Sequence, residues 1–327
     1  MRIAINGMGR IGRLLFRRLL NDGNIEIVAV NDTMPGDNLV YLLNYDSVYG
    51  PLSPKLSLSD AGSIQIEDRK IAVCREPDPE SLPWNKLKVD VVLECTGSFT
   101  TKAGCEKHIK AGAKKVLLST TGANDIPLLI FGFNQTRLTP DVTIISPGGC
   151  MTNCCIHVLY ILNSISIKSA QLTILHSYTS RQELVDAPNK NFRRGRAAAE
   201  SIIPVEIDLE KSLQRLMPGI QNKIAASSIR VPVANGAMAV LSMQLNDEVT
   251  VDQINSMFEK AAHNSYAGIL DYTEEPLVSL DIKGNTHSCV VDGTLTSVIG
   301  NHCNVVAWFD NEYGFTSRMI DWLNLLR

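Results

Sequence analysis

The residues Ile3-Ala4-Ile5-Asn6-Gly7-Met8-Gly9-Arg10-Ile11-Gly12 decide the fold, because an apolar strand runs through a glycine pattern into a helix. In this G-x-G-x-x-G pattern, Gly7 permits the tight turn, Gly9 lets the backbone approach a pyrophosphate, and Gly12 lets the helix lie close to the strand. The free N–H groups at the helix N-terminus favour an anion there. The position after a strand favours a dinucleotide site over a plain βα turn.

The second expected strand, residues 25–30, ends at Asn31 and Asp32. Dinucleotide-binding domains place an acidic residue about 20 positions after the glycines, where it binds a ribose 2′-hydroxyl and repels a 2′-phosphate. Asp32 read alone could also be a surface carboxylate. Together with the glycine pattern it favours NAD over NADP.

The first half of the chain alternates strands and helices. A helical pattern follows the glycines, and further apolar runs typical of parallel strands covered on both faces lie at 89–94, 115–119 and 142–146. This alternation predicts the α/β class, with a doubly wound parallel Rossmann sheet.

The pattern changes after residue 146. A helix begins near Cys150, and alternating strand-like stretches follow at 170–178, 227–233, 237–245 and 304–309. One strong helical run lies among them, at 251–262. They predict an α+β catalytic domain with a mostly antiparallel sheet. The amphipathic end, 314–327, is expected to pack on the first domain. The expected domains are therefore 1–148 with 312–327 for NAD binding, and 149–311 for catalysis.

The composition excludes several classes of protein. The 327 residues are 45% apolar and 20% charged, with a net charge of -3, which is ordinary for a globular protein and unlike a disordered chain or a coiled coil. No basic field is available for nucleic acid or an anionic membrane. No apolar run approaches the roughly 20 residues that span a bilayer, and no signal peptide is recognisable. We expect a cytoplasmic protein with no nucleic-acid or membrane partner.

The eight cysteines do not form the dense framework of a small secreted domain, so we expect reduced thiols. Cys150, Cys154, Cys155 and His157 raise the question of zinc. Four ligands along one short helical stretch would point in too many directions for a structural zinc site, so we expect no metal.

Cys150 is the candidate nucleophile. It follows Pro147-Gly148-Gly149 and opens an apolar helical run, where the helix dipole and free N–H groups favour thiolate and a developing oxyanion. A thiol nucleophile needs a base, and His176 at the end of a strand is the candidate. The other histidines are expected to be structural, namely His108, His157, His263, His287 and His302.

Three segments carry a resemblance to a known family. Residues 5–13, 150–154 and 308–315 resemble the N-terminal fingerprint, the nucleophile motif and the C-terminal signature of the glyceraldehyde-3-phosphate dehydrogenase family, and the similarity covers essentially the whole chain. Shorter segments are more similar to the erythrose-4-phosphate dehydrogenase branch, at 82–84, 201–205 and 287–294.

The resemblance implies an NAD-dependent oxidation of the aldehyde of a phosphorylated aldose. Cys150 thiolate would add to the aldehyde, His176 would move the protons, and hydride transfer would leave an acyl-thioester. Phosphate releases the acyl group in the glyceraldehyde-3-phosphate enzyme, and water releases it in the erythrose-4-phosphate enzyme. The resemblance also implies a homotetramer in which residues 179–196 reach toward a neighbour's cofactor site.

The remaining site residues follow from the same resemblance. The residues expected at the cofactor are Gly7, Gly9, Arg10, Ile11, Gly12, Asn31, Asp32, Arg75, Thr96, Gly97, Ser119 and Asn311. The residues expected at the substrate are Gly149, Thr152, Thr179, Arg181 and Arg230.

The chain departs from the family in both anion pockets beside the thiol. In the first, Thr179 and Arg230 match, but Arg181 stands where the family has an aspartate. In the second, Gly149 replaces a serine, and Ile207-Asp208 replaces a Thr-Gly pair. Since aspartate repels phosphate and isoleucine offers no hydrogen bond, we expect release of the acyl group by water, or by a phosphate held elsewhere, for example by Arg181 or Arg196.

Two other functions are compatible with the residues. An NAD-binding protein with altered anion pockets could have lost or changed its activity and serve a binding or regulatory role, although intact Cys150, His176 and Asn311 argue against it. A sugar or amino-acid dehydrogenase with another catalytic set would be insensitive to thiol alkylation.

Overall fold

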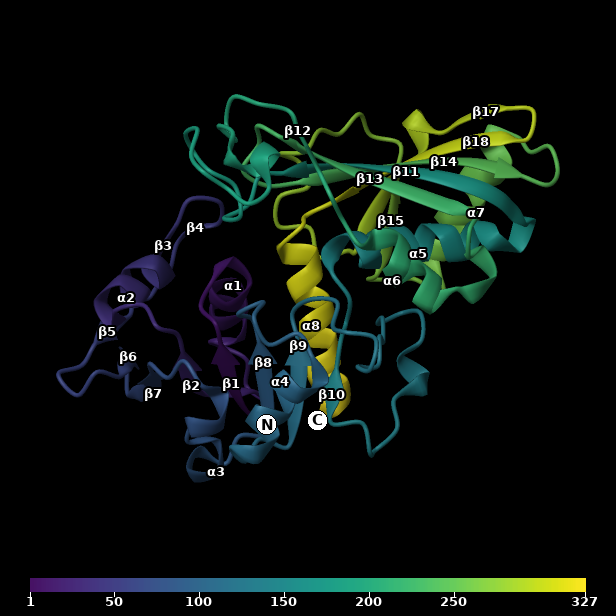
Figure 1. Ribbon diagram of the computed structural model, residues 1–327. Helices are drawn as coiled ribbons and strands as arrows, with labels where there is room; N and C mark the ends of the chain where they lie inside the picture. The colour runs from purple at the N-terminus through teal and green to yellow at the C-terminus, as the bar shows by residue number, and fades with distance from the viewer. The chain divides into compact units, whose positions relative to one another are not determined.

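The computed structural model describes all residues, 1–327, and divides into two compact units. The first comprises Met1–Gly149 with Arg318–Arg327, and the second comprises Cys150–Ser317 (Figure 1). No helix is both long and apolar enough to cross a membrane.

The first unit is built on an eight-stranded sheet in the order β10-β9-β8-β1-β2-β7-β6-β5. Neighbours from β10 to β7 are parallel, and β6 and β5 extend the sheet in antiparallel fashion. The strands are β1 (Arg2–Asn6), β2 (Glu26–Asn31), β5 (Ser57–Leu58), β6 (Ile64–Ile66), β7 (Arg69–Cys74), β8 (Val91–Glu94), β9 (Lys115–Leu118) and β10 (Ile144–Ile145). A hairpin adds β3 (Tyr45–Asp46) and β4 (Gly50–Pro51). The predicted parallel Rossmann sheet is confirmed.

The centre of this sheet is β1, whose Ile3, Ala4 and Ile5 are fully buried. The chain leaves β1 for β2 on one side and later returns to β8 on the other. Ligands of such sheets bind at the carboxyl ends of the strands where the order reverses, which here is the end of β1. The helices are α1 (Arg10–Leu19), α2 (Gly36–Asn44), α3 (Trp84–Leu87) and α4 (Lys102–Lys110).

The second unit contains a mostly antiparallel sheet in the order β12-β13-β11-β14-β18-β16-β15, with β17 paired to β18. Only β11 with β13 and β15 with β16 run parallel. The strands are β11 (Ile167–Ser177), β12 (Ile203–Val205), β13 (Ile224–Val231), β14 (Ala237–Leu245), β15 (Leu270–Thr273), β16 (Cys289–Asp292), β17 (Ser297–Ile299) and β18 (His302–Phe309). The predicted sheet class is confirmed.

Helices α5 (Cys150–Leu162), α6 (Leu209–Leu216) and α7 (Val251–His263) lie along one face of this second sheet (Figure 1). The predicted helix at Cys150 is thus present, and Cys154 and Cys155 are buried in it. Helix α7 begins with a capping box, in which Thr250 and Gln253 satisfy each other's backbone N–H groups. The last helix is α8 (Tyr313–Leu326), and its Trp322 packs edge-on against Phe131 within the first unit, with 6.0 Å between ring centroids.

Candidate active site

Cys150 and His176 meet in the second unit. Cys150 is the first residue of α5, and His176 lies near the carboxyl end of β11. Their reactive atoms, Cys150 Sγ and His176 Nε2, are 3.7 Å apart. Two residues separated by a helix and most of a strand are therefore a thiol–imidazole pair.

The hydrogen bonds of His176 fix which ring nitrogen carries the proton. His176 Nδ1 lies 2.7 Å from the carbonyl oxygen of Ser177, and a carbonyl can only accept, so Nδ1 donates. In the neutral ring, Nε2 then presents a lone pair to the thiol. This is the tautomer that a base for Cys150 requires.

Burial shifts the pKa of both members of this pair. Burial raises the pKa of the Cys150 thiol to about 11, while the charge of Arg230 and backbone hydrogen bonds of Met151 and Cys150 act in the opposite direction. Burial also lowers the pKa of His176 to about 3, and Arg230 adds to that effect. The helix N-terminus alone favours the thiolate, and desolvation opposes the charged forms of both groups. The buried cation and the N–H groups around Sγ therefore act against burial at this pair.

Arg230 supplies a buried cation next to this pair. It lies on β13 directly opposite His176 in the parallel register, and its Nη1 donates to the Ser177 carbonyl oxygen at 3.3 Å. Its Nε is buried and has no hydrogen-bond partner. Burial lowers the pKa of Arg230 to about 10. An anion that forms at Cys150, or binds beside it, would satisfy this guanidinium.

Asn311 is oriented by two donors. The Ser177 hydroxyl donates to Asn311 Oδ1 at 3.1 Å, and the Gly236 N–H donates to the same oxygen at 3.0 Å. A backbone N–H can only donate, so the oxygen of the amide is unambiguously assigned and its Nδ2 has no partner. That N–H group remains available to a carbonyl oxygen of a ligand.

The segment predicted to form the first anion pocket is rich in guanidinium groups. Thr179 and Arg181 lie in the turn after β11, where the Arg181 N–H donates to Thr179 Oγ1 at 3.4 Å. Burial lowers the pKa of Arg194, and the charge of Arg181 lowers it further. Neither guanidinium has a carboxylate partner within salt-bridge distance. Arg196, by contrast, is paired with Asp186 at 3.0 Å.

The residues predicted to form the second anion pocket offer few side-chain donors. Thr152 is buried in the first turn of α5, and the Gly149 Cα faces open space. The carboxylate of Asp208 is exposed and binds Lys211 Nζ at 2.6 Å. Lys211 therefore screens part of the repulsion that the sequence predicts between Asp208 and phosphate.

The first unit carries a cavity of about 380 Å³ at the carboxyl ends of its parallel strands. It brings together five of the predicted cofactor residues, Gly7, Gly9, Asn31, Asp32 and Thr96. The lining residues that the sequence reasoning missed are Asn6, Thr33, Glu76, Pro77, Cys95, Ser98 and Phe99. All seven end or follow a parallel strand, which is the signal that could have found them.

The three glycines are used in different ways. Gly7 has φ +92°, and a Cβ atom there would lie 2.5 Å from the backbone nitrogen of Thr96. A Cβ on Gly12 would lie 2.0 Å from the carbonyl oxygen of Gly7, so close packing of helix and strand requires glycine. Gly9 faces open space, and no side chain caps α1 behind it. The open, uncapped helix N-terminus fits a pyrophosphate.

Asp32 both shapes and lines the cavity. Its Oδ2 accepts from the Met8 N–H at 2.6 Å, and its Oδ1 accepts from the Met34 N–H at 3.0 Å. The carboxylate therefore holds the glycine turn in place and remains beside the cavity, where a ribose hydroxyl could reach it.

The other predicted cofactor residues do not line this cavity, namely Arg10, Ile11, Gly12, Arg75, Gly97, Ser119 and Asn311. The Arg10 side chain pairs with Asp46 at 2.7 Å, so α1 offers a ligand its backbone N–H groups in this region. The Arg75 side chain donates to the carbonyl oxygen of Thr33, a residue that lines the cavity, at 3.2 Å.

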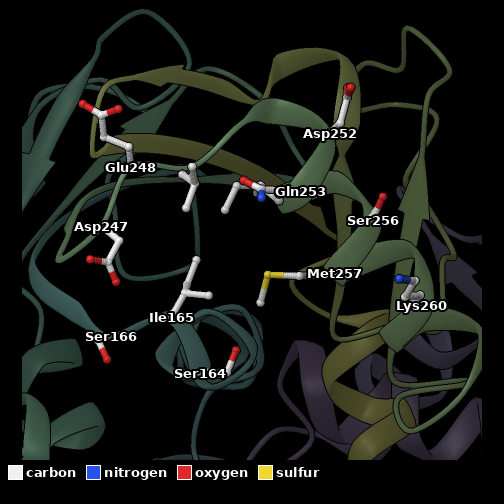
Figure 2. Close-up of a pocket in the computed structure, with 12 residues that line it drawn as sticks. Ser164, Ile165, Ser166, Asp247, Glu248, Asp252, Gln253, Ser256, Met257 and Lys260 are labelled. Atoms are coloured by element: carbon white, nitrogen blue, oxygen red, sulfur yellow. The ribbon is translucent and has the colours of Figure 1, made fainter.

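A larger cavity, of about 710 Å³, lies in the second unit and contains none of the predicted site residues. Figure 2 shows Ile165 and Met257 extending into its middle, with the carboxylates of Glu248 and Asp252 directed away from it. Nothing in it pairs a nucleophile with a base.

Comparison with known proteins agrees with this geometry. The NAD binding domain model of glyceraldehyde 3-phosphate dehydrogenase matches residues 1–102, and the C-terminal domain model of the same enzyme matches residues 149–311. The chain is 39% identical over 323 residues to glyceraldehyde-3-phosphate dehydrogenase 1 of Bacillus cereus, covering 98% of this chain and 96% of the relative. It is 40% identical over 324 residues to glyceraldehyde-3-phosphate dehydrogenase of Geobacillus stearothermophilus, with the same coverage. A Borreliella burgdorferi relative of that name is 40% identical over 330 residues, covering 98% of both chains.

Both domain models and these full-length relatives lead to the same assignment, and the glycine cradle fits the cofactor that the first model names. The chain is a member of the glyceraldehyde-3-phosphate dehydrogenase family, an oxidoreductase that uses NAD.

Proposed function

We propose that this protein oxidises the aldehyde of a phosphorylated aldose, glyceraldehyde-3-phosphate or erythrose-4-phosphate, through a hemithioacetal and a thioester on Cys150. The observation that carries the proposal is the 3.7 Å contact between Cys150 Sγ and His176 Nε2, with Nδ1 held as the donor. The names of the relatives support the substrate class.

The first step is addition of the thiol to the aldehyde. His176 Nε2 accepts the Sγ proton as Sγ forms a bond to the carbonyl carbon, and the imidazolium then returns a proton to the new alkoxide. Arg230 stabilises the negative charge while it is on sulfur or oxygen. The product is a neutral hemithioacetal, and the thiol and imidazole need not be charged at rest.

The second step is oxidation. Bound NAD supplies the hydride acceptor. His176 Nε2 removes the hydroxyl proton of the hemithioacetal as the C–H bond breaks, which leaves a thioester on Cys150. We assign Asn311 Nδ2 as the donor to the carboxamide oxygen of the cofactor, and Asp32 as the acceptor for its adenosine ribose.

The substrate phosphate is assigned to Thr179, Arg181 and Arg230, with Arg194 nearby. Arginine without a carboxylate partner is suited to a phosphate dianion. Arg196 is already paired with Asp186, so we assign no phosphate to it. Gly149 and Thr152 would border the reacting carbon.

We further propose that water releases the acyl group. Ile207 and Gly149 offer no side-chain donor to a second phosphate, and Asp208 adds a negative charge that Lys211 only partly offsets. After oxidation His176 Nε2 holds the hydroxyl proton; once that proton has passed to solvent, Nε2 would accept the proton of the attacking water.

The experiment measures NADH formation with each aldose phosphate, with and without inorganic phosphate. We expect turnover without phosphate and weak dependence on it. A steep dependence on phosphate would refute release by water while leaving the thioester intact. Failure to form any acyl-enzyme would instead support a binding or regulatory role.

The expected division of labour belongs to the same proposal: residues 1–148 with 312–327 bind NAD, and residues 149–311 carry the chemistry. We also propose a homotetramer. Support comes from large apolar side chains left exposed on the segment expected to meet a neighbour, such as Leu184 and Phe192, which are 74% and 89% exposed. Light scattering coupled to gel filtration tests the subunit number.

A further inference from the structure

A buried chain of hydrogen bonds lies beneath the cofactor cavity of the first unit. It begins at Trp84 on α3, passes through His108 on α4 to Glu94 on β8, and continues to Asn6 on β1 and Asn31 on β2. Both His108 and Trp84 are fully buried, and Glu94 is 2% exposed.

The first link fixes the tautomer of His108. The indole Nε1–H of Trp84 lies 3.0 Å from His108 Nδ1, and an indole N–H can only donate. Nδ1 must therefore be bare, so the proton of the neutral ring is on Nε2. That nitrogen lies 3.0 Å from Glu94 Oε2 and donates to it.

Glu94 accepts on both oxygens. Oε2 receives His108 Nε2–H and, at 2.6 Å, the Asn6 side-chain amide, while Oε1 receives the Thr96 N–H at 2.8 Å and the Thr96 hydroxyl. The carboxylate of Glu94 is buried, and both of its oxygens have hydrogen-bond partners.

The remaining links reach the cavity wall. With its Nδ2 used by Glu94, Asn6 accepts on Oδ1 from Asn31 Nδ2 at 2.6 Å. Asn31 in turn exchanges two hydrogen bonds, each 2.9 Å, with the backbone of Glu76. Asn6, Asn31, Glu76 and Thr96 all line the cofactor cavity. The links from Trp84 through His108, Glu94 and Asn6 to Asn31 each have one possible direction.

We infer that His108 and Glu94 are positioning residues for NAD. Trp84 locks the tautomer of His108, His108 then donates to Glu94, and Glu94 orients the four residues of the cavity wall. The sequence predicts only a structural role for His108. A structural role and a positioning role differ in a measurable way, since only the second links the imidazole tautomer to affinity for the cofactor.

The test uses two tryptophans of the same unit. Trp84→Phe removes the N–H that locks His108, whereas Trp322→Phe removes a fully buried indole whose Nε1 has no hydrogen-bond partner. The two substitutions remove the same atoms from the core. Loss of packing alone would therefore affect both variants alike.

We expect Trp84→Phe to raise the Kd for NAD by about fivefold, the size typical of one lost buried hydrogen bond, and Trp322→Phe by less than about twofold. The KM for NAD should rise in parallel, with kcat at saturating NAD unchanged within about twofold. Isothermal titration and steady-state kinetics measure these changes. Equal effects of the two variants on NAD affinity would overturn the inference.

The wild-type protein provides a readout that does not depend on how the variants fold. Nitrogen-15 spectra of the histidine side chains should show His108 as the Nε2–H tautomer at neutral pH, and Trp84→Phe should introduce the Nδ1–H form. A wild-type His108 that carries its proton on Nδ1 would contradict the tautomer lock directly.

Discussion

The clearest consequence of the thiol–imidazole pair concerns replacement of His176 by asparagine. Asparagine keeps a polar side chain at the end of β11 but cannot accept the Sγ proton. Cys150 must then ionise on its own, against the burial that raises its pKa to about 11. We expect turnover to fall by about 10²- to 10⁴-fold, the usual contribution of a general base.

The pH dependence follows from the direction of the two pKa shifts. A thiol with a pKa of about 11 is four units above neutral pH, so about one molecule in 10⁴ is thiolate there, and the fraction rises tenfold with each pH unit. In the wild type, the pKa of His176 is lowered to about 3, so the imidazole is unprotonated and can accept the proton at any pH above that value. The variant should therefore have a steep profile and the wild type a shallow one.

The assay is alkylation of Cys150 by iodoacetamide between about pH 6 and pH 9, followed by peptide mass spectrometry. Cys74 is partly exposed, has no link to His176, and serves as a reference thiol within each sample. In His176→Asn, alkylation of Cys150 relative to Cys74 should be slower than in the wild type at neutral pH. A Cys150 rate in the variant that is fast and independent of pH would mean that the helix N-terminus and Arg230 hold a thiolate without the base, and would refute the reasoning.

Two further predictions concern the cradle and the anion pocket. Gly12→Ala forces a Cβ to within 2.0 Å of the Gly7 carbonyl oxygen. It should lower the free energy of unfolding by about 3 kcal/mol, the upper end for overpacking. The Cβ of Gly9→Ala faces open space, so this variant should lower NAD affinity while its free energy of unfolding in urea changes little. Equal unfolding curves for the two variants would contradict this account. Arg181→Ala should raise the KM for the aldose phosphate by about tenfold, as expected for a lost charged hydrogen bond. Arg196 is paired with Asp186, so the control Arg196→Ala should change this KM by less than about twofold. If Arg196→Ala proves the more damaging in initial-rate assays, the assignment of the phosphate to Arg181 is wrong.

Local pattern was enough for the elements that carry a clear motif or a clear hydrophobic period. The glycine pattern predicted β1 and α1, and alternating residues predicted β11, β13, β14 and β18. Helix α4 was not predicted, because Lys102–Lys110 has few apolar residues, although Thr101 caps its first turn. The antiparallel extension by β5 and β6 was also missed, because strands of two and three residues carry too little periodicity to be recognised.

The site shows the same division between local and long-range information. The position of Cys150 at a helix start follows from Pro147-Gly148-Gly149. The pairing of His176 with Arg230 depends on the register of β11 and β13, whose residues are more than 50 positions apart, and no local pattern encodes it. The opposition between burial and the helix dipole at Cys150 depends on packing, which the local pattern does not show. Likewise, the roles of Glu94 and His108 require the packing of four elements.

The central claim is that Cys150 carries the acyl group after hydride transfer. The most direct measurement mixes the NAD-loaded protein with an aldose phosphate, records the first turnover by NADH absorbance, and quenches in acid for peptide mass spectrometry. We predict a burst of one NADH per chain and an acyl group on the peptide that contains Cys150, both lost in Cys150→Ser. A burst of NADH with no acyl group on Cys150, or undiminished turnover in Cys150→Ser, would contradict the account.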